Sequence, residues 1–252
     1  MNSFVKIFFL NSIVYQNCIT DDEQDCKYTD FSVVGSSGST LARCGSGPKS
    51  LYMGPYGLKT SVTLTITNFP PNNQMELQIG IWKIDSWDGE VFEIYANDIQ
   101  IDSIIQIASL GVSTCRNLWE DICQSFSVKC QMNGTDLTIK LKDNFDQSLW
   151  DESWGFRDFI LKLSVPCVNF YSECNYSGKL FQICKGEQTK RVTRIPYEIK
   201  SVLMAPNIIV KIKDPNYYGG VLQQFSTSQS CIESYKILYN NKNQFPKYIP
   251  SS

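Results

Sequence analysis

A short phrase that occurs twice in the last third of the chain places the strongest constraint on its fold. The first copy, residues 171–178, reads YSECNYSG, and the second, residues 212–219, reads IKDPNYYG. Both copies follow an apolar run, and both place Asn, Tyr and Gly at the same relative positions. The copies begin 41 residues apart, and a segment repeated at such a spacing usually marks stacked copies of one supersecondary unit. The last third is therefore predicted to contain a small β domain with two related halves.

Each copy of the phrase has the features of a folded β-hairpin. Gly178 and Gly219 occupy the position where the backbone needs a positive φ, which only glycine adopts without a steric clash. Tyr171 is expected to cover the first hairpin, and the hydroxyl of Ser201 is expected to hydrogen-bond to its turn. Ser234 is the corresponding serine after the second copy, where an isoleucine replaces the aromatic residue.

This order of aromatic residue, glycine and later serine resembles the Greek-key motif of the βγ-crystallin superfamily. The resemblance implies a double Greek key over residues 167–240, and an unrelated small β domain with turn-rich hairpins is the alternative. Calcium-binding members of the superfamily carry a pair of Asn or Asp residues shortly before the serine. The matching windows here, residues 196–201 and 229–234, lack that pair, so the resemblance gives no support for calcium at these two positions.

Residues 61–166 alternate between apolar and polar side chains, as half-buried β-strands do. The strands are expected near residues 62–66, 75–81, 91–96, 99–107, 126–130, 137–141 and 159–165. Short strands separated by turns at this spacing predict an antiparallel β-sandwich or jelly roll. Because no long helix is expected either, the predicted fold class is all-β throughout.

The remaining segments are assigned by composition. Residues 1–20 are interpreted as a signal peptide cleaved after Thr20, and the alternative is a buried N-terminal strand. Residues 21–60 are expected to be rich in loops, and residues 241–252 to form a polar tail. No later segment approaches the roughly 18 apolar residues that a membrane span needs, so none is predicted.

Charge and residue types exclude several classes of function. The net charge of -2 and the pI near 5.3 argue against nucleic acid as a partner, because phosphate binding relies on clustered Lys and Arg. The chain has no histidine, which removes Ser-His-Asp and Cys-His catalysis and His-ligated zinc. Glu152 and Asp158 are a conceivable acid pair for glycoside hydrolysis, but two such carboxylates are common on loops. The protein is predicted not to be an enzyme.

The ten cysteines are predicted to form disulfides, because they show no repeated CxxC ligand pairs. Cleavage after Thr20 would remove Cys18 and leave nine: Cys26, Cys44, Cys115, Cys123, Cys130, Cys167, Cys174, Cys184 and Cys231. An odd number requires a free thiol or a bond to a second molecule. Alternatively, Cys18 is retained and all ten pair internally. Asn133 and Asn175 begin Asn-x-Ser/Thr triplets that suit a secretory route.

Two acidic phrases rich in tryptophan carry the candidate chemistry, residues 84–90 (IDSWDGE) and 150–158 (WDESWGFRD). Asp85, Asp88 and Glu90, with Asp151 or Asp158 from the second phrase, would supply oxygen ligands to Ca²⁺. The spacing matches no EF-hand. The alternative is a tight turn in which Asp85 and Asp88 accept backbone hydrogen bonds.

Tryptophans accompany these acids at positions 82, 87, 150 and 154. Exposed indoles would form a platform for stacking sugars, whereas burial in the core is the more common fate of tryptophan. Core burial is therefore the preferred expectation for these four side chains.

The phrases at residues 68–71 (NFPP), 84–90 and 152–158 resemble a β-sandwich module of ciliate secreted and surface proteins. With the crystallin-type C-terminus, the whole chain resembles crystallin-domain cargo proteins of ciliate secretory granules, the mucocysts. The resemblance implies a secreted, non-enzymatic structural or binding protein, either granule cargo or matrix component, whose partners are other secreted proteins or further copies of itself. The competing hypothesis is a Ca²⁺-dependent carbohydrate-binding module that engages glycans on a cell surface.

Overall fold

The structure is a computed structural model of the chain. It describes residues 3–9, 13–35, 40–68, 74–105, 111–115, 119–131, 134–185, 193–213 and 222–232. Within these residues regular structure is almost entirely β-strand, and the helices are two three-residue 3₁₀ turns, η1 (Glu23–Asp25) and η2 (Tyr28–Asp30). Neither is long and apolar enough to cross a membrane. The predicted all-β class is confirmed.

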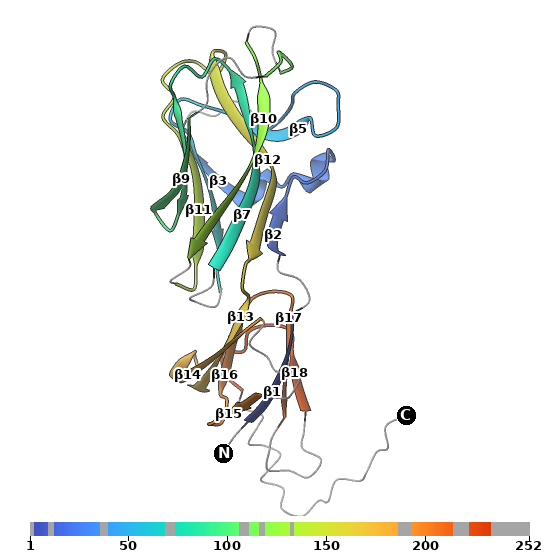
Figure 1. Ribbon diagram of the computed structural model, residues 1–252, viewed down its shortest axis with the longest axis vertical. Coiled ribbons are helices and arrows are strands. Elements are labelled where there is room, and N and C mark those ends of the chain that lie inside the picture. Colours follow the sequence, from blue (N-terminus) through green and yellow to red (C-terminus); the bar gives the residue numbers. More distant parts are fainter. Residues whose placement is uncertain are drawn as a thin grey trace, which may run out of the picture. The chain divides into compact units, whose positions relative to one another are not determined.

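The chain divides into two compact units, and most of their strands are labelled in Figure 1. The larger unit comprises described residues of Phe9–Cys167 together with Ala205–Asn207. The smaller unit comprises described residues of Met1–Phe8, of Val168–Met204 and from Ile208 onward. Each unit contains two antiparallel sheets.

The larger unit is an antiparallel β-sandwich. One sheet has the order β10 (Ile122–Gln131), β7 (Gln74–Asp85), β12 (Glu152–Leu163), β5 (Leu51–Tyr56) and β4 (Leu41–Arg43), and β2 (Ile13–Asn17) also pairs with β12. The other sheet has the order β3 (Phe31–Val34), β6 (Ser61–Ile66), β11 (Leu137–Asp143), β8 (Val91–Ala96) and β9 (Ile99–Ile105). The seven strands expected after residue 60 are all present.

Aromatic side chains join the two sheets of the sandwich. The ring of Phe92 on β8 lies 4.7 Å from that of Trp154 on β12, edge to face. Phe31 on β3 contacts Phe156 on β12 in the same way, at 5.3 Å. Offset and edge-to-face pairs of this kind contribute about 0.5–1.5 kcal/mol beyond their buried area. These contacts between the sheets therefore centre on the first half of β12.

The segment of residues 21–60 differs from the loop-rich expectation, because it contributes β3, β4 and β5. β5 reads LYMGPY, and five of its six residues are buried. A strand buried on both faces shows no alternation of apolar and polar residues. The period-two pattern therefore could not reveal it.

The segment interpreted as a signal peptide also contains strands. β1 (Ser3–Phe9) pairs with β15 in the smaller unit, and β2 pairs with β12 in the larger unit. This arrangement corresponds to the alternative of an N-terminal strand. Cleavage after Thr20 stays a prediction, and it would remove both strands.

The smaller unit combines a three-stranded sheet, β14 (Ser177–Cys184), β13 (Cys167–Glu173) and β16 (Ser201–Met204), with a second sheet. The second sheet has the order β15 (Thr193–Ile195), β1, β17 (Ile208–Lys213) and β18 (Leu222–Phe225). After the β13–β14 hairpin the chain crosses to the second sheet in β15 and returns beside β13 in β16. Gly219, Ser234 and the polar tail lie outside the described residues.

The β13–β14 hairpin has the local geometry expected from its sequence. Gly178 has a φ of +80°. Tyr171 is buried and its ring lies 6.0 Å from that of Tyr176. The Oγ of Ser201 accepts a hydrogen bond from the Tyr176 amide at 3.1 Å and donates one to the Glu173 carbonyl at 2.6 Å. The predicted contact between this serine and the turn is confirmed, while the crystallin relationship stays a prediction.

Eight cysteines are disulfide-bonded. Cys18 bonds to Cys26, Cys44 to Cys115 and Cys174 to Cys231, and Cys167 and Cys184 are also in disulfides. In the full chain Cys18 is therefore paired, but the alternative in which all ten cysteines pair internally is wrong, because two cysteines are free.

Cys123 and Cys130, which were expected to form disulfides, are free thiols. Both lie on β10, where they face Trp82 and Met75 of β7, so neither has a cysteine opposite it. Burial raises the pKa of the Cys123 thiol to about 11 and also raises that of Cys130. Since the thiolate is the reactive form, these two thiols are poor candidates for cross-linking.

The two glycosylation candidates have different outcomes. Asn175 lies in the turn of the β13–β14 hairpin, where its side chain is exposed and its φ is +58°. Asn133 lies outside the described residues. Asn175 is therefore the candidate with an accessible position.

Candidate functional site

The pairing of β7 with β12 brings the two acidic phrases together. Asp85 at the end of β7 lies opposite Glu152 at the start of β12. Beyond the strands, the amide and the hydroxyl of Ser86 both donate hydrogen bonds to the Asp151 carbonyl, at 3.0 and 2.9 Å. The loop that follows β7 is thereby fixed to the turn that precedes β12.

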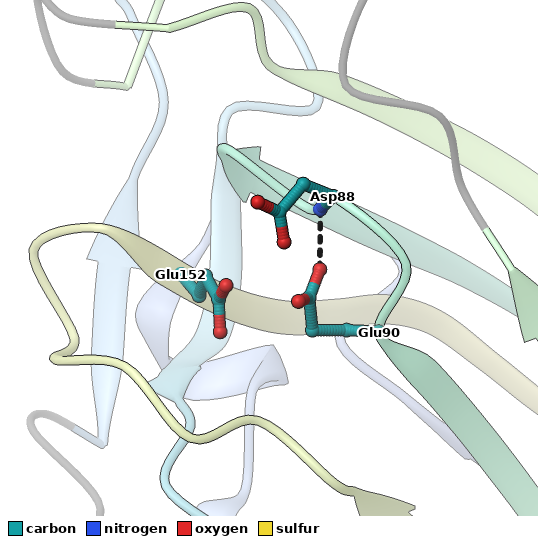
Figure 2. A group of neighbouring side chains, drawn as sticks. All are labelled: Asp88, Glu90 and Glu152. Carbon is teal, nitrogen blue, oxygen red and sulfur yellow. Dashed lines mark hydrogen bonds between the residues drawn. The ribbon is translucent and has the colours of Figure 1, made fainter.

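Three carboxylates converge at this junction, and we call them the carboxylate cluster: Asp88, Glu90 and Glu152 (Figure 2). One oxygen from each lies within 4.8 Å of the others. The amide of Asp88 donates a hydrogen bond to Oε2 of Glu90. Asp88 is exposed, Glu90 is half-buried and Glu152 is fully buried.

Glu152 is the most perturbed member of the cluster. Its two carboxylate oxygens are buried, and neither forms a hydrogen bond of normal geometry, although the Glu90 side chain and the Gln147 amide lie close enough to influence its pKa. Burial, followed by the negative charge of Glu90, raises the pKa of Glu152 to about 7. A buried carboxylate without compensating partners costs several kcal/mol in its charged form. Glu152 therefore occupies an environment that favours either a proton or a cation.

The expected set of metal ligands is corrected by this geometry. Asp88 and Glu90 converge as predicted, but Asp85 is not in the cluster. Asp85 is fully buried, its amide donates to Oδ1 of Asp121 at 3.1 Å, and its carbonyl accepts from Nζ of Lys83 at 2.6 Å. With a φ of +64°, Asp85 ends β7 and turns the chain, which places it in a separate polar network.

The acids of the second phrase also differ from expectation. The Asp151 carboxylate accepts a hydrogen bond from the Ser148 hydroxyl at 2.9 Å, and Asp158 forms an ion pair with Lys49 at 3.0 Å. Neither belongs to the carboxylate cluster. Glu152 does belong to it, although its sequence position suggested only a pairing with Asp158.

Glu152 and Asp158 do not form a glycosidase pair. Glu152 is the first residue of β12 and Asp158 lies in the middle of that strand, and six residues of strand span roughly 20 Å. The carboxyl groups of glycosidases lie at most about 9.5 Å apart. The structure therefore removes the one acid pair that the sequence offered for hydrolysis.

Two of the four tryptophans of interest belong to the core, as preferred. Trp87 is fully buried, its Nε1 donates to the Ser153 carbonyl at 2.9 Å, and its ring lies 4.7 Å from Phe145. Trp154 is also fully buried, and its Nε1 donates to Oδ2 of Asp143 at 2.7 Å. Both rings hold the cluster end of the sandwich together.

The other tryptophans are accessible to different degrees. Trp82 is half-buried against Tyr52, whereas Trp150 is 71% exposed. Trp119, which the sequence did not single out, is 52% exposed. Residues 119–121 read WED and are similar to residues 150–152 (WDE), so this short similarity is the sequence signal that could have indicated Trp119.

Trp119 and Trp150 lie on loops that are fixed to the same end of β7. The carbonyl of Glu120, next to Trp119, accepts a hydrogen bond from Nζ of Lys83 at 2.7 Å. Asp151, next to Trp150, accepts the two hydrogen bonds from Ser86. We call these two exposed indoles the tryptophan pair. The pair and the carboxylate cluster therefore share one end of the sandwich.

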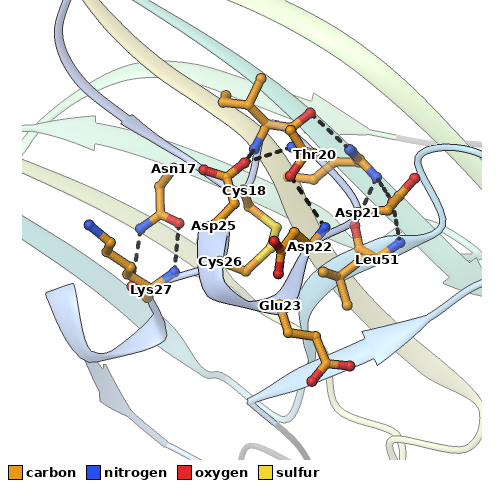
Figure 3. Close-up of a disulfide and its surroundings, with 12 residues drawn as sticks. Asn17, Cys18, Thr20, Asp21, Asp22, Glu23, Asp25, Cys26, Lys27 and Leu51 are labelled. Atoms are coloured by element: carbon orange, nitrogen blue, oxygen red, sulfur yellow. Dashed lines mark hydrogen bonds and ion pairs between the residues drawn. A yellow bond between two sulfur atoms is a disulfide. The ribbon is translucent and has the colours of Figure 1, made fainter.

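A second constrained region surrounds the Cys18–Cys26 disulfide (Figure 3). The Oδ2 of Asp25 accepts hydrogen bonds from the amides of Ile19 and Thr20 at 2.9 and 2.7 Å. The disulfide and the hydrogen bonds to backbone amides hold this short loop in place. The residues drawn offer no group of unpaired ligands. The region is thus a structural clamp for the chain between β2 and β3.

Neither a family model nor a curated protein matches the chain. Among solved structures, the chain is similar to a family 35 carbohydrate-binding module from Clostridium thermocellum, at 11% identity over 62% of this chain and 96% of that one, with a TM-score of 0.35.

Two other similar structures show comparable values. The CBM22-1 xylan-binding domain of Paenibacillus barcinonensis Xyn10C has 10% identity over 62% and 97% of the two chains, with a TM-score of 0.39. The K3 cleaved adhesin domain of Lys-gingipain from Porphyromonas gingivalis has 9% identity over 60% and 99%, with a TM-score of 0.38. Identities and TM-scores this low assign neither a family nor a ligand to this chain.

Proposed function

We propose that the protein is a non-enzymatic extracellular binding protein whose larger unit binds carbohydrate. The observation that carries the proposal is the tryptophan pair, Trp119 and Trp150, exposed at one end of the sandwich. Tryptophan is highly buried on average, so two accessible indoles on neighbouring loops indicate a contact surface. An indole presents a flat apolar face, which suits the C–H face of a sugar ring.

Polar groups at the same end of the sandwich as the tryptophan pair suit the hydroxyl groups of a sugar. Asp88 is exposed at the edge of the carboxylate cluster, and Asp151 is exposed directly after Trp150. Carboxylates accept hydrogen bonds from hydroxyl groups. Apolar faces and hydrogen-bond acceptors at one end of the sandwich are the combination that suits a sugar better than a purely apolar ligand.

Hydrogen bonds hold described residues close to each member of the tryptophan pair in place. The Trp150 amide donates to the Ser148 hydroxyl at 3.3 Å within a turn that Ser86 holds in place. On the other loop, Oδ2 of Asp121 accepts the amides of Thr114 and Cys115 at 2.7 and 2.6 Å. A surface ordered before binding loses less entropy when the ligand binds.

An extracellular location is supported by the eight disulfide-bonded cysteines. Disulfides persist in oxidising compartments and are rare in the cytosol. Each native bond typically stabilises a fold by about 2–4 kcal/mol, which suits a protein that functions outside the cell.

The test is a glycan array followed by titration of the best oligosaccharide, monitored by tryptophan fluorescence. Trp150→Ala and Trp119→Ala are each expected to weaken binding by at least about tenfold, the typical cost of removing a stacking aromatic. Ile99→Ala is the matched control, because Ile99 is 65% exposed on a different hairpin. Absence of any retained glycan, or wild-type affinity in both tryptophan variants, would overturn the proposal.

The second candidate is a structural role as cargo of a regulated secretory granule, with self-association or other granule proteins as partners. The observation that favours it is the Ser201 contact with the β13–β14 turn, which suits the crystallin-type motif of granule cargo. The test is to localise a tagged full chain before and after stimulated secretion. A tagged protein that never enters granules would remove this candidate and leave carbohydrate binding untouched.

A further inference from the structure

The carboxylate cluster lies where the loop after β7 meets the first residue of β12 (Figure 2). We propose that Asp88, Glu90 and Glu152 bind one Ca²⁺ ion, with the buried carboxylate of Glu152 as its innermost ligand. The proposal does not rest on carbohydrate binding, and its test contains no sugar.

The first argument is geometric. The three carboxylates come from two chain segments that are far apart in sequence, yet an oxygen of each lies within 4.8 Å of the others. Calcium–oxygen distances of 2.3–2.6 Å place ligands on opposite sides of one ion about 5 Å apart. A single ion can therefore contact all three oxygens with small side-chain adjustments.

The second argument is the state of Glu152, which is independent of the clustering. Glu152 is fully buried, and neither of its carboxylate oxygens forms a hydrogen bond of normal geometry. Buried polar atoms are nearly always satisfied in folded proteins, and exceptions call for an explanation such as a bound ion. Asp88 and Glu90 are the groups toward which this unsatisfied carboxylate is directed, as Figure 2 shows.

The donor atoms select the class of ion. All three are carboxylate oxygens, hard ligands that suit Ca²⁺ and Mg²⁺ rather than thiolate-binding or imidazole-binding metals. Mg²⁺ requires ligands at about 2.0–2.1 Å in near-ideal octahedral geometry. The open cluster, with one exposed member, Asp88, leaves room for the waters that complete the larger and more flexible Ca²⁺ shell.

Bound calcium would fix the end of the sandwich that carries Trp87. Asp88 follows Trp87 directly, and the Trp87 indole is hydrogen-bonded to Ser153, the neighbour of Glu152. An ion shared by Asp88 and Glu152 would link the same two segments a second time. The expected consequence is a more stable junction between the loop after β7 and β12.

The experiment is thermal melting of the disulfide-intact full chain in EDTA, in millimolar CaCl₂ and in millimolar MgCl₂. Calcium is expected to raise the melting temperature by about 3–8 °C, because a ligand selective for the native state stabilises it by mass action. Magnesium is expected to have a smaller effect. Terbium chloride provides a second readout, since Trp87 beside Asp88 can sensitise the luminescence of a bound Tb³⁺ ion.

The decisive variant is Glu152→Gln, which keeps the side-chain shape and removes the charge. It is expected to abolish both the calcium-dependent rise and the terbium signal. Asp136→Asn is the matched control and should retain both responses. Asp136 is exposed just before β11. The other end of β11 is the one near the cluster, because Asn144, which follows that end, accepts a hydrogen bond from the amide of Val91, the neighbour of Glu90.

If Glu152→Gln does not fold, Asp88→Asn replaces it, because Asp88 is exposed. This variant is expected to weaken the apparent calcium affinity at least tenfold while melting like the wild type in EDTA. A wild-type melt that is identical in EDTA and calcium would overturn the proposal, and so would a full calcium response in Glu152→Gln.

Discussion

The guanidinium group of Arg157 lies 2.9 Å from the carboxylate of Asp21, and the Arg157 side chain is fully buried in β12. The same guanidinium donates to the Leu51 carbonyl at 2.9 Å and to the Ile19 carbonyl at 3.3 Å. Arg157 therefore ties β5 and the chain after β2 to the central strand of the sandwich. Its charge is compensated by Asp21 and by Asp158 at 3.3 Å.

Arg157→Ala is expected to lower the free energy of unfolding by about 3–5 kcal/mol, because it leaves buried acceptors without a donor. Asp21→Asn should cost less, since Asp158 still compensates the guanidinium. Urea denaturation measures both. Arg43→Ala is the control, because its ion pair with Glu23 at 3.7 Å and its hydrogen bond to the Asp21 carbonyl at 3.1 Å are both exposed. Equal losses in Arg157→Ala and Arg43→Ala would contradict this account.

The Asp21 carboxylate also predicts a pH dependence. Partial burial raises the pKa of Asp21, but hydrogen bonds from the Leu51 amide, Arg157 and the Lys49 amide outweigh it and lower the pKa from 3.8 to about 2. A carboxyl whose pKa is depressed on folding stabilises the fold above its unfolded pKa and loses that contribution as pH falls through its folded pKa.

The stabilisation by Asp21 should thus be complete above pH 4 and be lost between about pH 4 and 2. Because the side chain is partly exposed, we expect a contribution of about 1–2 kcal/mol. Stability curves of wild type and Asp21→Asn, measured by urea denaturation from pH 6 to 2, should converge at the acid end. Curves that stay parallel over this range would show that Asp21 does not titrate with folding.

The hydrogen bonds of Ser201 predict a change confined to the smaller unit. Ser201→Ala leaves the Tyr176 amide without its acceptor, which is expected to cost about 1–2 kcal/mol. Hydrogen exchange should accelerate at β13 and β16 while β7 and β12 keep their protection. Ser226→Ala, at an exposed serine after β18, serves as the control, and an equal effect in both variants would remove the special role of Ser201.

The two free thiols predict a labelling pattern. Cys123 and Cys130 are the free cysteines, and burial raises the pKa of both. A thiol-specific reagent at pH 7.5 should modify the native protein slowly, and in denaturant without reductant it should rapidly label two thiols per chain. Rapid labelling of the native protein, or labelling of more than two thiols after unfolding, would contradict the cysteine assignment.

Local patterns in the sequence predicted those parts of the fold that depend on neighbouring residues. Alternation identified β11, for example, in which Leu137, Ile139 and Leu141 face the core. The same kind of local information predicted the turn at Gly178 and the contact of Ser201 with it. These features follow from steric rules and from a period of two, both of which can be read within a few residues.

Pairings between distant segments were decided only by the tertiary structure. Glu152 joins Asp88 and Glu90 because β12 lies beside β7 in one particular register, and a shift by a single residue would turn Glu152 to the other face. Trp119 likewise became a candidate only when the structure showed that its side chain is exposed and that the adjacent Glu120 carbonyl binds Lys83. The sequence determined that the chain forms strands and supplies acids and tryptophans, whereas register decided which of them meet, because side-chain direction alternates along every strand.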